Sequence, residues 1–333
     1  MEKLVEREPA PPKNTFSSAP ALAVQFFLIP LAVVVVIFIV YGGFRLLMSS
    51  ERTPQEFLAD VQSGGRERRW PAAYELGRLL VEDPDIEVRH PHLGAAMVDV
   101  FSELTDAARM TDFTPTGWMS WSGDDSVVRR YLALAIGRLS RPPPTAVVAL
   151  VDALDDPDPE ARIAVIWSLA SIGEESIVGD VEAMYKAEDA GVRKMAVYAL
   201  GALPAGQELS TLKVALDDPV VDVQWNAAVA LARHGSNEGL WVLQRMIDRD
   251  YVDRMVSRTP SVDATLDPVS EVMISALEAV AALQVGSLRS EIEILSQHDI
   301  SLRVREVALR ALDVLDLAAI DTHGAMTLRK EVR

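Results

Sequence analysis

A short pattern that returns about every 31 to 35 residues constrains the fold of this chain more than any other feature. Each copy has an apolar or small residue, then usually Arg, an apolar residue three positions later and Leu seven positions later. The clearest copies lie around Arg162, Arg193, Gln224 and Arg305, for example VRKMAVYALGALP and VQWNAAVALARHG. A repeat of this length is typical of a solenoid of stacked helix pairs, in which each unit packs only on its neighbours. The pattern therefore predicts an all-α fold without a central core.

About seven helix pairs fit the chain between residues 54 and 316, and within each pair we name the first helix A and the second helix B. The turns between A and B include Asp156 with Pro157 and Asp218 with Pro219. Asp accepts hydrogen bonds at the start of a helix and Pro fits the first helical turn. In three pairs an Asp also precedes the Arg by four positions. We expect these residues to cap the B helix and to form an ion pair with that Arg; they are Asp125, Asp158 and Asp189.

The spacing of apolar residues in each B helix indicates which face packs in the core. We number positions from the Arg or its equivalent, which are Arg69, Arg129, Arg162, Arg193, Gln224, Ser270 and Arg305. Positions −1, +3, +6, +7 and +10 are apolar or small, as expected for one helix face. Position +6 is small in six pairs, which lets neighbouring helices approach. Position +7 is a column of large aliphatic residues: Leu76, Ile136, Leu169, Leu200, Leu231, Leu277 and Leu312.

Positions +1 and +5 point away from that core face, yet in the first five pairs they are mostly apolar or aromatic. Contiguous exposed apolar residues mark binding surfaces, and Trp and Tyr dominate the energetics of interfaces. We therefore predict an aromatic groove that binds a protein partner; the alternative is that these side chains fill gaps between repeats. Position +8, which is Gly or Ala in these pairs, is expected to leave space in front of the aromatic rings. The predicted groove residues are Trp70, Tyr74, Leu134, Ile163, Trp167, Tyr198, Trp225 and Val229.

Two long loops interrupt the array between an A and a B helix, at residues 111–124 and 257–267. Insertions at matching points of a solenoid emerge on the same edge. The first loop is rich in apolar residues for a loop and contains Trp118 and Trp121. We add these two Trp residues to the predicted partner-binding set; the alternatives are a contact with a membrane and a loop folded back onto its own repeat.

The N-terminal region predicts a membrane anchor. Residues 1–20 are rich in Pro and charge and are expected to be a flexible tail, whereas residues 21–40 are almost wholly apolar. A helix of about 20 apolar residues spans the hydrocarbon layer of a bilayer. We therefore expect a transmembrane helix over residues 21–47, a linker over 48–53, the solenoid over 54–316 and a tail or cap over 317–333. The distribution of Arg residues favours a bacterial inner-membrane protein with a cytoplasmic solenoid.

Composition excludes several kinds of function. The formal net charge is −17, and such an acidic surface repels phosphate backbones, so we expect no nucleic-acid partner. There is no Cys, which excludes disulfides and thiolate metal sites. The five His residues include His234, which is placed at a helix end where it can pack near the C-terminal carbonyl groups. We predict no catalytic residues, no metal and no cofactor.

The repeating pattern resembles the HEAT-repeat family, in particular the bacterial phycobilisome-lyase-like HEAT repeats, and the resemblance is strongest from Asp125 to Gly235. It implies a superhelix with the A helices on the convex side and the B helices lining the concave side. The first and sixth pairs depart from the family pattern, because Arg69 is followed by Pro71 and Ser270 replaces the Arg. HEAT-like di-iron hydroxylases use His-Glu pairs as ligands, and the chain contains no such dipeptide.

The sequence leaves two functions open. The first is a membrane-anchored, non-enzymatic scaffold or adaptor that binds a protein partner in or at the same membrane through the concave groove, and contacts lipid through residues 21–47. The second is a bilin-lyase-like enzyme or enzyme subunit, which is suggested by the family resemblance alone. HEAT repeats define a fold and not a reaction, so the resemblance does not choose between them.

Overall fold

The computed structural model describes the chain except for residues 1–28, 49–51, 113–122, 205–208, 257–266 and 332–333. All regular secondary structure in the described residues is helical. The chain divides into two compact units, Met1–Thr53 and Pro54–Arg333, which are considered separately below.

In the first unit the described residues form one helix, α2 (Ile29–Met48), whose apolar side chains from Leu31 to Tyr41 are exposed. The part of α2 with described side chains, Leu31 to Tyr41, is about 16 Å long along the helix axis. This is roughly half the thickness of a bilayer's hydrocarbon layer. Residues 21–28 of the predicted span lie outside the described residues. No helix in the described part of the chain is long and apolar enough to cross a membrane. This finding contradicts the predicted transmembrane helix over residues 21–47, the inner-membrane localisation and the contact with lipid.

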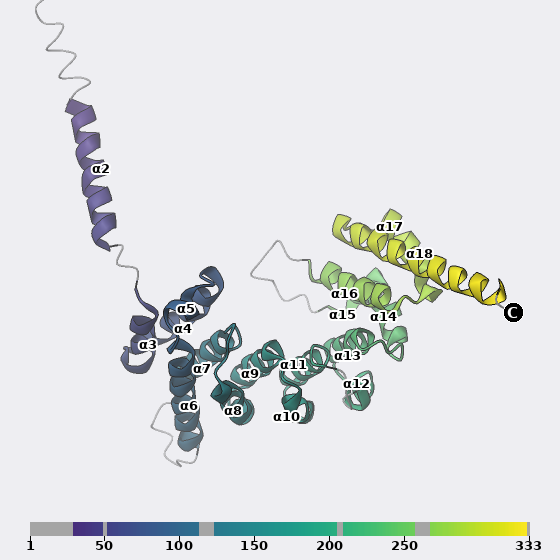
Figure 1. The fold of residues 1–333 in the computed structure, drawn as a ribbon, viewed down its shortest axis with the longest axis horizontal. Helices are drawn as coiled ribbons and strands as arrows, with labels where there is room; N and C mark the ends of the chain where they lie inside the picture. The colour runs from purple at the N-terminus through teal and green to yellow at the C-terminus, as the bar shows by residue number, and fades with distance from the viewer. Residues whose placement is uncertain (1–28, 49–51, 113–122, 205–208, 257–266, 332–333) are drawn as a thin grey trace, which may run out of the picture. The chain divides into compact units, whose positions relative to one another are not determined.

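The second unit is a stack of seven helix pairs, as the repeating pattern predicts (Figure 1). In Figure 1 the B helices α7, α9, α11 and α13 form one row, and the A helices α8, α10 and α12 form a second row beside it. The pairs are α3 (Pro54–Ser63) and α4 (Arg66–Glu82), α6 (Leu93–Asp112) and α7 (Gly123–Ile136), α8 (Pro144–Asp152) and α9 (Pro159–Ile172), α10 (Val178–Met184) and α11 (Ala190–Leu200), α12 (Leu209–Ala215) and α13 (Val221–Arg233), α14 (Leu240–Met246) and α16 (Pro268–Leu283), and α17 (Arg289–His298) and α18 (Leu302–Glu331).

Two helices differ from the sequence expectation. The A helix of the sixth pair is broken after α14, because Asp248 accepts a hydrogen bond from the Tyr251 N–H at 3.1 Å and so starts a separate short helix, α15 (Arg249–Met255). The last B helix, α18, continues past Asp316 to Glu331 without a break. A further short helix, α5 (Ile86–Arg89), connects the first two pairs.

The core consists of the predicted columns of B-helix residues. Six of the seven residues at position +7 are buried, whereas Leu312 in the last pair is half-buried because no further pair covers it. Burying one such side chain stabilises the fold by about 1.5–3 kcal/mol. The small residues at position +6 are buried as well: Ala135, Ser168, Ala199, Ala230, Ala276 and Ala311.

Glycines at position +8 have a different role from the one expected. A Cβ atom at Gly201 would lie 2.5 Å from the Cβ atom of Ala230, and one at Gly137 would lie 2.7 Å from Ser168. Ala230 and Ser168 are the residues at position +6 of the next pair. These glycines therefore allow the B helices of successive pairs to approach closely, and do not simply leave space in front of the aromatic rings.

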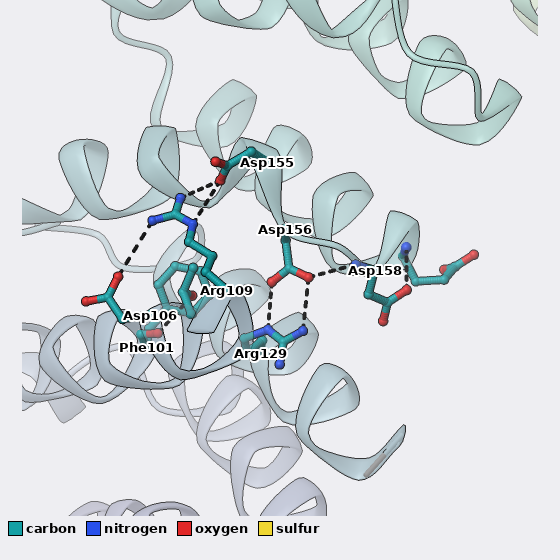
Figure 2. Close-up of polar contacts among 9 residues, drawn as sticks. Phe101, Asp106, Arg109, Arg129, Asp155, Asp156 and Asp158 are labelled. Carbon is teal, nitrogen blue, oxygen red and sulfur yellow. Dashed lines mark hydrogen bonds and ion pairs between the residues drawn. The ribbon is translucent and has the colours of Figure 1, made fainter. Parts of the chain in front are cut away.

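The Arg at position zero joins successive pairs instead of pairing within its own helix. Arg129 donates two hydrogen bonds to Asp156 of the third pair, from Nε at 2.6 Å and from Nη2 at 3.0 Å, and both side chains are buried (Figure 2). Arg193 likewise forms two hydrogen bonds with Asp218 of the fifth pair, at 3.0 and 3.2 Å. These Asp residues lie at position −6 of the following pair.

Two of the three Asp residues at position −4 cap a B helix as expected, whereas Asp125 lies within α7. Asp158 accepts a hydrogen bond from the Glu160 N–H at 3.1 Å, and Asp189 accepts one from the Val192 N–H at 2.9 Å. The predicted ion pair with the Arg four positions later is not formed in either helix, among the contacts of the described residues. Asp125 pairs with Arg69 of the preceding pair.

Candidate functional site

We call the inner face the surface of the B helices formed by positions +1, +2, +5 and +9. Of the predicted groove residues on it, Trp70, Tyr74 and Tyr198 are exposed. Trp225 is only 5% exposed, which was not expected for its position. The remaining four predicted residues are half-buried: Leu134, Ile163, Trp167 and Val229. Trp118 and Trp121 lie outside the described residues.

One hollow on the inner face, which we call the main cavity, has a volume of about 500 Å³. It brings together three predicted residues from three consecutive B helices, Trp167 of α9, Tyr198 of α11 and Trp225 of α13. Apart from Val256, which follows α15, all of its lining residues come from B helices. The others that line it are Lys194, Met195, Asp222, Asn226, Pro268 and Val272.

A second cavity of about 220 Å³ adjoins the main cavity, because Tyr198 and Trp225 line both. Val229 lines this second cavity. Ile163 does not line any of the three cavities and instead packs towards the start of α11, 3.0 Å from where a Cβ atom of Gly191 would lie. For Ile163 the structure thus agrees with the alternative that apolar residues at these positions fill gaps between repeats.

A third cavity of about 250 Å³ lies between α4 and α7 and contains Tyr74, Leu134 and Tyr131. The ring of Tyr131 is 5.5 Å from that of Tyr74, edge to face, and 6.3 Å from that of Trp70, stacked. These distances are typical of favourable aromatic pairs. The predicted residues of the first two pairs therefore form their own aromatic cluster, separate from the main cavity.

Trp225 carries the most unusual polar group of the inner face. Its Nε1 is buried and has no hydrogen-bond partner among the described residues. A buried donor that is left unsatisfied costs about 1–3 kcal/mol, so native proteins rarely retain one without a reason. Other atoms of Trp225 line both the main and the second cavity.

Two Arg residues stack on the aromatic rings of the main cavity. The guanidinium carbon of Arg138 lies 5.0 Å from the ring centre of Trp167, and that of Arg233 lies 5.6 Å from the ring centre of Tyr198. Such distances are typical of cation–π contacts. Sequence reasoning missed both residues, although they occupy position +9 of their pairs, as does Arg78 of the third cavity. An Arg at position +9 in several pairs is the sequence signal that could have identified them.

Carboxylates next to the cavities are already neutralised. Asp222 pairs with Lys194 at 3.7 Å, and Glu271 pairs with Arg303 of the last pair. No carboxylate lies within ion-pair distance of Arg138 or Arg233 among the described residues. Thus the charges that remain unpaired around the aromatic rings are cationic, in a chain whose formal net charge is −17.

The described residues contain no group of three or more His, Asp or Glu that could hold a metal ion in an active site. His234 is a structural residue, because its Nε2 lies 2.9 Å from the carbonyl oxygen of Leu200 at the end of the neighbouring α11, as the sequence suggested. The inner face therefore combines aromatic and aliphatic side chains with polar and charged ones.

Part of the solenoid matches a known family of repeats. Residues 120–183 and 181–259 match the model of the HEAT repeat family. The matched HEAT segments include α9, α11 and α13, which carry Trp167, Tyr198 and Trp225. No curated protein matches the sequence.

Solved structures with a similar course of the chain come from diverse proteins. One is the complex of CpcE and CpcF of phycocyanin lyase from Nostoc sp. PCC7120, with 21% identity, coverage of 80% of this chain and 96% of that chain, and a TM-score of 0.47. A second is an engineered protein with 18% identity, coverage of 80% and 97%, and a TM-score of 0.39. A third is human deoxyhypusine hydroxylase in complex with glycerol, with 18% identity, coverage of 79% and 97%, and a TM-score of 0.32.

Proposed function

We propose that the HEAT solenoid is a non-enzymatic scaffold or adaptor that binds a protein partner on its inner face, with the main cavity as the central contact. In this proposal the solenoid spans residues 54–316, with 48–53 as a linker and 317–333 as a cap. A clustered set of Trp, Tyr and Arg side chains around a hollow is the composition of an interface hot spot.

The observation that carries the proposal is the gathering of Trp167, Tyr198 and Trp225 around one cavity. Position +7 already supplies the buried aliphatic column of the stack, so the stack does not need three large aromatic rings on the opposite side of the B helices. The unpartnered Nε1 of Trp225 adds a polar group that the free solenoid does not use.

Affinity capture with the full chain tests this proposal. Trp167→Ala and Tyr198→Ala are expected to lose a partner that the unchanged chain retains, because each removes one wall of the main cavity. Trp241→Ala is the matched control: Trp241 is also exposed and also carries a stacked Arg, Arg245 at 5.3 Å, but it lies on the A helix α14 and lines none of the three cavities.

The result is read together with circular dichroism, which checks that each variant is folded. Equal capture by the unchanged chain and by both cavity variants would contradict the proposal. The bilin-lyase-like alternative makes a different prediction, since a chromophore that copurifies with the chain and absorbs visible light would support it instead.

A further inference from the structure

We infer that the segment bound on the inner face is an extended acidic peptide, which inserts an apolar side chain into the main cavity and pairs its carboxylates with Arg138 and Arg233. This inference rests on the proposed function and names the chemistry of the partner. It follows from the shape of the inner face and its unpaired charges.

Continuity of the hollows indicates an extended ligand. Arg138 lines the third cavity and stacks on Trp167, which lines the main cavity. Tyr198 and Trp225 line the main cavity and the second cavity, and Arg233 closes the second. The three cavities thus follow one another across α4, α7, α9, α11, α13 and α16. A single peptide strand that crosses the B helices can contact all three.

Charge complementarity indicates an acidic ligand. Asp222 and Glu271 are neutralised by Lys194 and Arg303, whereas Arg138 and Arg233 lack a carboxylate within ion-pair distance in the described chain. A guanidinium group that is held by an aromatic ring keeps its N–H donors free for a carboxylate, which it can bind in a forked geometry. The two guanidinium groups lie against Trp167 and Tyr198, which line the main cavity, so acidic residues are expected next to the apolar anchor.

The positions of the two guanidinium groups limit the length of the peptide. The guanidinium of Arg138 lies against Trp167 of α9 and that of Arg233 lies against Tyr198 of α11, and these are neighbouring B helices. Packed helices lie about 8–10 Å apart, so the two groups are separated by about 20 Å at most. An extended chain covers about 3.3 Å per residue, so about six residues or fewer separate the two acidic positions. The apolar residue is expected near the middle of that stretch.

Titration of the full chain with synthetic peptides tests the inference. The probe is a blocked peptide with two glutamates at each end of an uncharged stretch of about five residues that has phenylalanine at its centre. Three matched peptides replace the glutamates by lysine, replace the glutamates by glutamine, or replace the phenylalanine by serine. Calorimetry gives the dissociation constant of each peptide.

The acidic phenylalanine peptide is expected to bind at least about tenfold more tightly than the other three. Arg138→Gln and Arg233→Gln are each expected to weaken its binding about fivefold. Arg245→Gln is the matched control, since Arg245 also stacks on a Trp but lines none of the three cavities, and it is expected to leave the dissociation constant unchanged.

Each alternative outcome is distinct. Equal binding of the glutamine and glutamate peptides, with dependence on Trp167, overturns the acidic partner but leaves the proposed function standing. Absence of binding by all four peptides at millimolar concentration overturns the inference, while the captured partner still decides the proposed function. Tighter binding of an oligothymidylate, with loss in both Arg variants, overturns it in favour of single-stranded nucleic acid, which also stacks on aromatic rings.

Discussion

Arg249 and Asp299 form a buried, forked ion pair in which Nε and Nη2 of Arg249 donate to the Asp299 carboxylate at 2.8 and 2.7 Å. Asp299 occupies position −6 of the seventh pair, where other pairs use the Arg of the preceding B helix. That Arg is replaced by Ser270 in the sixth pair, and Arg249 on the short helix α15 donates to the Ser270 hydroxyl at 3.2 Å as well. A guanidinium group from a different helix therefore restores the contact that the substitution removed.

Replacement of Arg249 by Met is expected to destabilise the fold by about 3 kcal/mol, because the Asp299 side chain is 1% exposed and loses its cation. Chemical denaturation followed by circular dichroism measures this change. In the Arg249→Met background, Ser270→Arg places the Arg where the other pairs have it and is expected to recover part of the loss. Arg289→Met is the control, since Arg289 and its partner Asp316 are both exposed, and it is expected to change the unfolding midpoint little. Equal midpoints for Arg249→Met and Arg289→Met would show that the buried pair adds no stability.

Gly201→Ala is expected to lower the free energy of unfolding by about 1–3 kcal/mol, since the added Cβ would lie 2.5 Å from the Ala230 Cβ and would force α11 and α13 apart. Gly77→Ala is the matched variant at position +8 of the first pair. A Cβ there would lie 3.6 Å from the Ala135 Cβ, an ordinary contact, and Ala favours the helix by up to about 1 kcal/mol. Thermal unfolding of both variants compares the two effects. A loss of stability in Gly77→Ala as large as in Gly201→Ala would argue against close approach as the cause.

The stability contribution of Asp218 is expected to depend on pH. Burial acts to raise the pKa of Asp218, but the hydrogen bonds from Arg193 and from the Val220 N–H outweigh it and hold the pKa below its ordinary value of 3.8. A carboxyl group whose pKa is lowered in the folded state stabilises the fold fully above its unfolded pKa, and this contribution is lost as the pH falls through the folded pKa. Asp218→Asn should therefore destabilise the chain at pH 7 and progressively less below pH 4.

Denaturant titrations of the unchanged chain and of Asp218→Asn between pH 7 and pH 2.5 measure this dependence. Asp222→Asn serves as the control, because Asp222 is half-exposed and pairs with Lys194 at 3.7 Å. A gap between the unchanged chain and Asp218→Asn that stays constant across this pH range would contradict the assignment of the lowered pKa to the Arg193 contact.

Trp225→Phe is expected to lower the free energy of unfolding of the free chain by less than the loss of a buried hydrogen bond would. The reason is that Nε1 has no partner among the described residues. The loss should be limited to the smaller buried volume of the Phe ring. Tyr198→Phe removes an exposed hydroxyl from the same cavity and is the comparison variant. A destabilisation well beyond that of other large-to-smaller aromatic changes would reveal an acceptor for Nε1 in the folded chain.

The columns at positions +6 and +7 could be predicted because they depend only on the helical period within one B helix. Ser168 and Leu169 are buried as expected for this reason. The direction of the Arg ion pairs could not be predicted in the same way, since Arg129 and Asp156 belong to different pairs and their contact depends on how one pair sits on the next. The contact of Arg249 with Asp299 could not be predicted from the repeat pattern either, because Arg249 lies on the short helix α15 and not on a B helix.

The candidate site, too, could be predicted only where it depends on the period of a single helix. Periodicity placed Trp167 and Tyr198 on the face opposite the core, and the structure places both at the main cavity. It could not show that Trp225 is buried, because Val256, Pro268 and Val272, which share its cavity, follow it by 30 residues or more in the sequence. The stacking of Arg138 on Trp167 was missed because it joins two consecutive pairs. Sequence patterns locate the face, and contacts between repeats determine its chemistry.

Arg162 shows what happens to the stack where one of these contacts is missing. The residue at position −6 of the following pair is Ala187, and Nε of Arg162 is buried with no hydrogen-bond partner in the described chain. The step from α9 to α11 therefore lacks the ionic tie that Arg129 and Arg193 provide on either side of it. Trp167 and Tyr198 border the main cavity from the two sides of that step. Under a pulling force on the ends of the solenoid, we expect this step to open before the two ion-paired steps beside it, and a peptide bound across it would hold α9 and α11 together.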